Sequence, residues 1–163
     1  MSKYEIWSVI LQVMIGVVAA GTLIVYYRQL KVMGKQLATM EESSRGQSTL
    51  ELVNFIQSPE VREARHLVRH KLASVPFKKW SQADRQSAAL VIANYDVAAM
   101  LLKTGVAPVH LIVENWGTSI IHCHGILKPF IIEQRQKTGG DQLYWRNFDW
   151  LLEQTHHVRK SAK

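Results

Sequence analysis

The hydrophobic side chains of this sequence are concentrated near its N-terminus, where residues 6–27 include no formally charged residue. A helix over these 22 residues would be about 33 Å long, which is enough to cross the ~30 Å hydrocarbon core of a bilayer. Such a run predicts a transmembrane helix. Aromatic rings, which favour the headgroup region at either membrane surface, flank it on both sides at Tyr4, Trp7, Tyr26 and Tyr27.

The charges beside this run predict its orientation. Before it, the single cation Lys3 is opposed by Glu5, whereas Arg28, Lys31 and Lys35 follow it. Cytoplasmic flanks of membrane helices carry an excess of Lys and Arg. We therefore expect the N-terminus outside and the C-terminal domain in the cytoplasm.

A cleaved signal peptide is the alternative interpretation of the same run. The small residues of 18–21 offer a cleavage site. Against this alternative, the segment before the run is nearly uncharged, and the run is longer than the apolar part of most signal peptides.

Small residues within the run also allow two membrane helices to approach each other. Gly16 and Ala20 are four residues apart, a spacing found at helix–helix contacts in membranes, and Gln12 offers a hydrogen bond within the span. A homodimer through Gly16 and Ala20 is therefore possible.

After the membrane run, apolar residues recur at helical spacing and then stop. Leu30, Met33, Leu37 and Met40 form a stripe that predicts a juxtamembrane helix packing on the domain, too short to indicate a coiled coil. The polar stretch 42–47, which contains Gly46, predicts a hinge. We expect four regions: a transmembrane helix (6–27), a juxtamembrane helix and hinge (28–47), a cytoplasmic helical domain (48–157) and a basic tail (158–163).

Start and stop signals divide the predicted domain into helices. Helix starts are indicated by Ser48 with Glu51, by Ser58 before Pro59, by Ser81 with Asp84, and by Pro108. The expected helices cover 48–55, 58–73, 81–105, 108–138 with a kink near Pro129, and 142–156. No run alternates as a strand would. The predicted fold is all-α: one N-terminal transmembrane helix, a juxtamembrane helix and a compact bundle of about four to five helices.

Charge and cysteine content narrow the function classes. The net charge of +7 suits either nucleic acid or an anionic membrane surface. We favour membrane proximity, because no nucleic-acid-binding motif accompanies the charge. The single cysteine, Cys123, excludes an intramolecular disulfide.

The motifs of cofactor, metal and hydrolase sites are absent from the sequence, so we predict no catalytic, cofactor or metal site. His66 and His70 share a helical face, but the arginines of the same helix would repel a cation. His122, Cys123 and His124 are consecutive, so on a helix their side chains point apart.

Asp96 is the most unusual residue of the apolar helix 88–102. A carboxylate there must be paired or reach solvent, because an unpaired buried charge is costly. We expect a buried polar network of Asn94, Asp96, Arg135 and Arg146 that sets helix register. The alternative is that Asp96 acts as a catalytic acid.

Two groups of side chains are candidates for contact with a partner. Trp145 and Trp150 cannot both face the core with Phe148, and an exposed Trp is typical of a binding surface. The alternative is packing of these rings at the edge of the domain. The second group is a basic helical face made of Arg62, Arg65 and Arg69.

Several short stretches resemble a bacterial domain-of-unknown-function family of small proteins, which have one N-terminal membrane helix and a cytosolic helical domain. They are residues 58–65, 94–98, 104–106 and 144–151, together with Trp116 and Arg135. The resemblance implies the same architecture and hence the bacterial inner membrane. It implies no activity, cofactor or catalytic residue.

These observations predict a membrane-anchored, non-catalytic interaction or regulatory protein. The expected partners are the lipid bilayer and another membrane or membrane-proximal protein, whereas nucleic acid is not expected. The alternative is a membrane-tethered enzyme that uses Asp96 in a pocket of the bundle.

Overall fold

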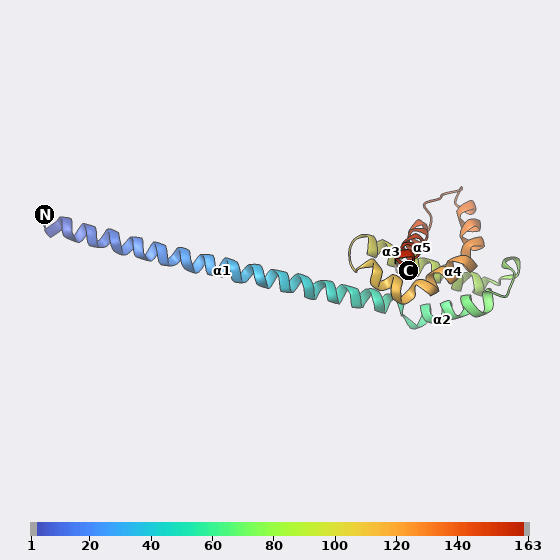
Figure 1. The fold of residues 1–163 in the computed structure, drawn as a ribbon. Helices are drawn as coiled ribbons and strands as arrows, with labels where there is room; N and C mark the ends of the chain where they lie inside the picture. Colours follow the sequence, from blue (N-terminus) through green and yellow to red (C-terminus); the bar gives the residue numbers. More distant parts are fainter. Residues whose placement is uncertain (1–2, 162–163) are drawn as a thin grey trace. The chain divides into compact units, whose positions relative to one another are not determined.

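The computed structural model describes residues 3–161 of the 163, and its chain folds into helices and connecting turns without a strand in that range (Figure 1). This confirms the predicted all-α class. Its contacts divide the chain into two units, one that ends at Ser44 and one that begins at Arg45. Each unit is described separately below.

The first unit is formed by the N-terminal part of the long helix α1 (Lys3–Ile56). Its apolar side chains are exposed, with Trp7, Leu23 and Tyr27 each about 70 % accessible. Among the described residues, α1 is the one helix that is long and apolar enough to cross a membrane, with a mean hydropathy of 2.0 over 18 residues. A signal sequence meets the same criteria. The side chains of Lys3, Tyr4 and Glu5 lie outside the part that the structure describes.

Helix α1 continues through the segment 42–47 to Ile56, and the boundary between the two units lies within that segment. Gly46 in an exposed helix costs only about 1 kcal/mol. Across the same stretch, the Gln47 side chain donates a hydrogen bond to Glu51 at 3.2 Å, one helical turn further on. Ser48 therefore lies within the helix and does not begin a new one.

The second unit is a helical bundle built around α3 (Gln82–Lys103). Helix α3 contacts α2 (Pro59–Leu67), α4 (Val109–Lys137) and α5 (Arg146–Ser161). A π-helical turn (Val68–Leu72) extends α2, and a 3-10 turn (Phe77–Lys79) precedes α3. The core contains Tyr95 of α3, Ile120 of α4, Phe148 of α5 and Ile56, the last residue of α1.

Sequence signals explain most of these boundaries. Ser81 and Asp84 form the expected capping box at the start of α3. Pro59 begins α2 and Pro108 caps α4. After α3 and α4 the chain turns at Gly105, Gly139 and Gly140, all with φ between 77° and 85°, a conformation that glycine adopts without strain.

Two boundaries differ from the prediction. Helix α5 begins at Arg146, after a turn in which Trp145 has a φ of 59°. It continues to Ser161, four residues into the segment predicted as a tail, where Val158 packs on the core. Helix α4 continues past Pro129 and changes direction near its middle (Figure 1).

Candidate functional site

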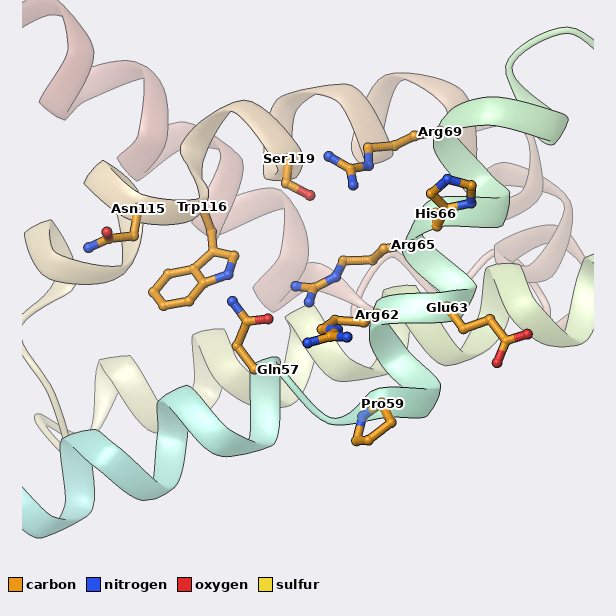
Figure 2. A pocket seen from close by; sticks show the side chains of 10 residues that line it. All are labelled: Gln57, Pro59, Arg62, Glu63, Arg65, His66, Arg69, Asn115, Trp116 and Ser119. Carbon is orange, nitrogen blue, oxygen red and sulfur yellow. The ribbon is translucent and has the colours of Figure 1, made fainter.

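A pocket of about 680 Å³ opens between α2, the π-helical turn after it and α4. Figure 2 shows its lining, with arginine side chains on one wall and α4 side chains on the other. Its lining residues are Gln57, Pro59, Arg62, Glu63, Arg65, His66, Arg69, Asn115, Trp116 and Ser119. Hydrogen-bond donors dominate this set.

The arginines share one wall because of their helical spacing. Arg62, Arg65 and Arg69 are separated by three and four residues, which places them on one face. The apolar residues Val61 and Val68 are buried on the neighbouring face and hold α2 on the bundle. The three guanidinium groups consequently point into the same space (Figure 2).

Arg65 is the most buried of the three, with 4 % of its surface accessible. Its guanidinium donates a hydrogen bond to the Tyr95 hydroxyl at 3.4 Å and lies 5.8 Å from the centre of that ring. The Tyr95 hydroxyl donates in turn to Ser119 Oγ at 2.9 Å. Burial raises the pKa of Tyr95, so this phenol stays neutral and keeps its proton for Ser119. The chain of contacts holds Arg65 in place.

No carboxylate neutralises this wall of the pocket. Within residues 3–161, none of the three arginines forms an ion pair. Glu63 also lines the pocket, but Figure 2 shows its carboxylate pointing away from the guanidinium groups. A buried cation without a counter-ion is costly. The arrangement therefore favours an anion in the pocket.

The opposite wall carries an aromatic ring and amides. Trp116 is half-buried, and in the described part of the chain its indole pairs with no other ring. The Asn115 and Gln57 side chains flank it in Figure 2. This wall offers a flat apolar surface bordered by polar groups.

Nucleophilic chemistry is not favoured beside the pocket. Cys123 is buried, and its Sγ lies 3.9 Å from Ser119 Oγ. Burial raises the pKa of the Cys123 thiol, which keeps it protonated and unreactive at neutral pH. The rings of His66 and His70 lie 4.3 Å apart, but residues 3–161 contain no group of three or more His, Cys, Asp or Glu placed to hold a metal.

The four residues predicted to form one polar network have separate surroundings. Asn94 donates to the Phe55 carbonyl at 3.0 Å, near the end of α1, and its buried Oδ1 has no partner. Asp96 accepts hydrogen bonds from the Phe148 backbone N–H at 3.1 Å and from Asn147 Nδ2 at 3.2 Å. Asp96 thus caps the N-terminus of α5, and neither predicted arginine is its partner.

The two predicted arginines have different surroundings. Arg135 pairs with Asp149 at 2.6 Å and donates to the Tyr144 carbonyl, whereas Arg146 is exposed. Burial opposes ionisation of Asp149, but hydrogen bonds from His124 and Arg135 outweigh it, so the pKa of Asp149 is lowered. This cluster fastens α5 to α4.

Both tryptophans predicted as contact residues are half-buried. Trp145 lies 6.0 Å from Phe130 and 4.3 Å from Tyr144, centre to centre. The Lys103 ammonium lies over the Trp150 ring, with Lys103 Nζ 4.9 Å from the centre of that ring. Of the two groups of predicted contact residues, the three arginines line one pocket, whereas neither tryptophan lines it.

The wall opposite the arginines was not predicted from the sequence. Trp116 and Ser119 come from α4, and Tyr95, which contacts Arg65, comes from α3, so their positions beside α2 depend on helix packing. One local signal was present: Arg65 falls between Ala64 and Val68 on the apolar side of α2. An arginine at such a position indicates a buried cation.

Fold and pocket together define a class: an all-helical protein with one long apolar N-terminal helix and a cationic pocket in its bundle. The chain belongs to the DUF4760 family, described as a domain of unknown function, whose model matches residues 11–155. This confirms the resemblance to a domain-of-unknown-function family. No curated protein and no solved structure matches the chain.

Proposed function

We propose that this protein is a membrane-anchored, non-catalytic binding protein, whose helical domain recognises an anionic ligand in the arginine pocket. One observation carries the proposal. Arg65 is almost fully buried, lines the pocket and pairs with no carboxylate among the described residues. A buried cation without a counter-ion lowers the stability of the fold. Binding of an anionic ligand would explain why an arginine occupies this buried position.

The anchor supports the same function. From Ile10 onward, the apolar part of α1 has no buried side chain in its own unit, as expected of a helix whose surroundings are lipid. We propose a single-pass topology in the bacterial inner membrane with the domain in the cytoplasm, because the cations Arg28, Lys31 and Lys35 follow the apolar run. Anchoring would confine a ligand-responsive domain to the neighbourhood of other membrane proteins.

Thermal unfolding of the full chain in an uncharged detergent tests the proposed function. Inorganic phosphate should raise the melting temperature saturably, because a ligand that binds only the folded state stabilises it. Arg62→Gln combined with Arg69→Gln should abolish the rise. The matched control is Arg146→Gln combined with Lys160→Gln, which removes the same charge from exposed positions of α5 and should keep the rise.

Two outcomes would contradict the proposal. One is a melting temperature that no anion raises at constant ionic strength. The other is an equal loss of the phosphate effect in both double variants, which would indicate general charge screening in place of a site.

A further inference from the structure

The arginine pocket offers two different kinds of recognition at its two walls. Three guanidinium groups extend from α2 and the π-helical turn, and the Trp116 indole faces them from α4 (Figure 2). A ligand that satisfies both walls carries negative charge at one end and a flat ring at the other. At about 680 Å³ the pocket has the size of a small-molecule site.

We propose that the ligand is a nucleoside monophosphate, with its phosphate on Arg62, Arg65 and Arg69 and its base against Trp116. This inference rests on the proposed anion-binding function and names the ligand class. It also distinguishes a free nucleotide from a lipid headgroup, which could present the same phosphate without a base.

The charge at the arginine wall favours a phosphate over a carboxylate. A phosphomonoester carries close to two negative charges at neutral pH and three acceptor oxygens, which suits three planar guanidinium donors. Arg65 is already oriented by the Tyr95 hydroxyl, 3.4 Å away. A fixed donor loses little freedom when the ligand binds.

The aromatic wall favours a base. Trp116 is half-buried and pairs with no ring in the range that the structure describes. A base can stack on the accessible part of such a ring, and stacking shows no strong preference among the four bases. The Gln57 amide beside the indole (Figure 2) can both donate and accept hydrogen bonds, as the edge of a base or a ribose hydroxyl requires. Asn115 Nδ2 already donates to the Leu111 carbonyl at 2.7 Å, which leaves the Asn115 carbonyl oxygen as an acceptor.

Isothermal titration calorimetry on the full chain in uncharged detergent tests this inference. The probes are adenosine, guanosine, cytidine and uridine monophosphates, with ribose 5-phosphate as the phosphate without a base and adenosine as the base without a phosphate. At least one nucleotide should bind about tenfold or more tightly than ribose 5-phosphate, a gain of the size expected from stacking. Adenosine should bind most weakly.

Variants at each wall separate the two contributions. Trp116→Leu should reduce nucleotide affinity to that of ribose 5-phosphate and leave ribose 5-phosphate binding unchanged. Arg69→Gln should weaken both ligands together. Trp150→Leu is the matched control, since Trp150 is also half-buried but does not line the pocket.

The possible failures are distinguishable. Equal affinity of the intact protein for ribose 5-phosphate and every nucleotide would overturn the inference and leave the proposed function standing. Absence of binding by any phosphate compound would overturn both. Tighter binding to mixed micelles containing phosphatidate than to any nucleotide would overturn the inference and identify a lipid headgroup as the ligand.

Discussion

At the residue scale, the Asp84 carboxylate at the start of α3 combines a helix cap with an ion pair. It accepts hydrogen bonds from the Ser81 backbone N–H at 3.0 Å and from the Lys71 ammonium at 2.6 Å, and its side chain is 5 % exposed. The hydrogen bond from Lys71, followed by one that the Ser81 hydroxyl donates at 2.9 Å, holds the pKa of Asp84 below its usual range. The folded state therefore favours the ionised form.

This lowered pKa predicts how stability responds to acid. A group whose pKa is depressed by folding stabilises the protein above its unfolded pKa, about 3.9 for Asp, and loses that contribution as the pH falls through the folded value. Asp84→Asn should cost about 1–2 kcal/mol near neutral pH, and the difference should close below about pH 4. Thermal unfolding of both proteins across this pH range measures it.

The control for this experiment is Glu153→Gln, which removes an exposed carboxylate from α5. It should change stability little at any pH, as expected of an exposed charge. A constant difference between the intact protein and Asp84→Asn across the pH range would show that the contribution of Asp84 does not depend on its charge.

Asp96 shows why some side-chain partners could not be predicted from the sequence. A carboxylate in an apolar helix indicated a buried partner, and an arginine was expected. The actual partner is the N-terminus of another helix, through the Phe148 backbone N–H. Backbone donors have no sequence signature, whereas the capping box of Ser81 and Asp84 was predictable because its two members lie three residues apart.

At the element scale, the same contact predicts how α5 is held. Asp96→Ala should cost about 1–2 kcal/mol, as loss of a helix cap does, and should speed hydrogen exchange at the start of α5. Asp96→Asn keeps one acceptor oxygen and should cost less. A catalytic role for Asp96 would instead leave stability unchanged in both variants, and calorimetry with hydrogen exchange separates these outcomes.

The packing of α4 against α5 depends on a glycine. A Cβ added at Gly117 would lie 3.0 Å from Thr155 Cγ2. The Thr155 hydroxyl is buried and donates to the Leu151 carbonyl at 2.7 Å, so the methyl group cannot readily turn away. Gly117→Ala should therefore destabilise the domain by about 1–3 kcal/mol, despite the higher helix propensity of Ala, as measured by thermal unfolding.

Gly125 in the same helix provides the matched control. A Cβ there would meet no atom within 4 Å, so Gly125→Ala should be neutral or stabilise by about 0.5–1 kcal/mol through helix propensity alone. Equal effects of the two substitutions would mean that the α4–α5 contact tolerates a methyl group at Gly117.

At the scale of the whole molecule, topology is the property to test. Cys123 is the single cysteine and is buried, so background labelling by an impermeant maleimide should be low in intact cells. A cysteine at Ser2 should react from outside, and a cysteine at Ser161 should react only after the membrane is opened. The reverse pattern would contradict the proposed orientation, and an intact mass that lacks the first residues would identify a signal peptide.

For the whole molecule, the fold class could be predicted from the sequence, whereas the pocket could be predicted only in part. The apolar run and the stop and start residues predicted the fold class, because each signal is local. The helix start predicted at Ser48 was wrong, because polar residues and one glycine are compatible with an exposed helix and α1 continues through 42–47. Only the arginine wall of the pocket could be predicted, because Arg62, Arg65 and Arg69 share one helical face. Trp116 and Ser119 come from α4, and their position opposite the arginines depends on tertiary packing.

The burial of Arg65 has a consequence for protein turnover. A single hydrogen bond to Tyr95 at 3.4 Å compensates little for desolvating a cation, and exchanging such charges for apolar residues of similar volume is often neutral or stabilising. Arg65→Met should thus melt no lower than the natural protein while losing ligand affinity, a trade-off between stability and function. In the cell, the empty form would be degraded faster than the occupied form, which would link the abundance of the protein to the supply of its ligand.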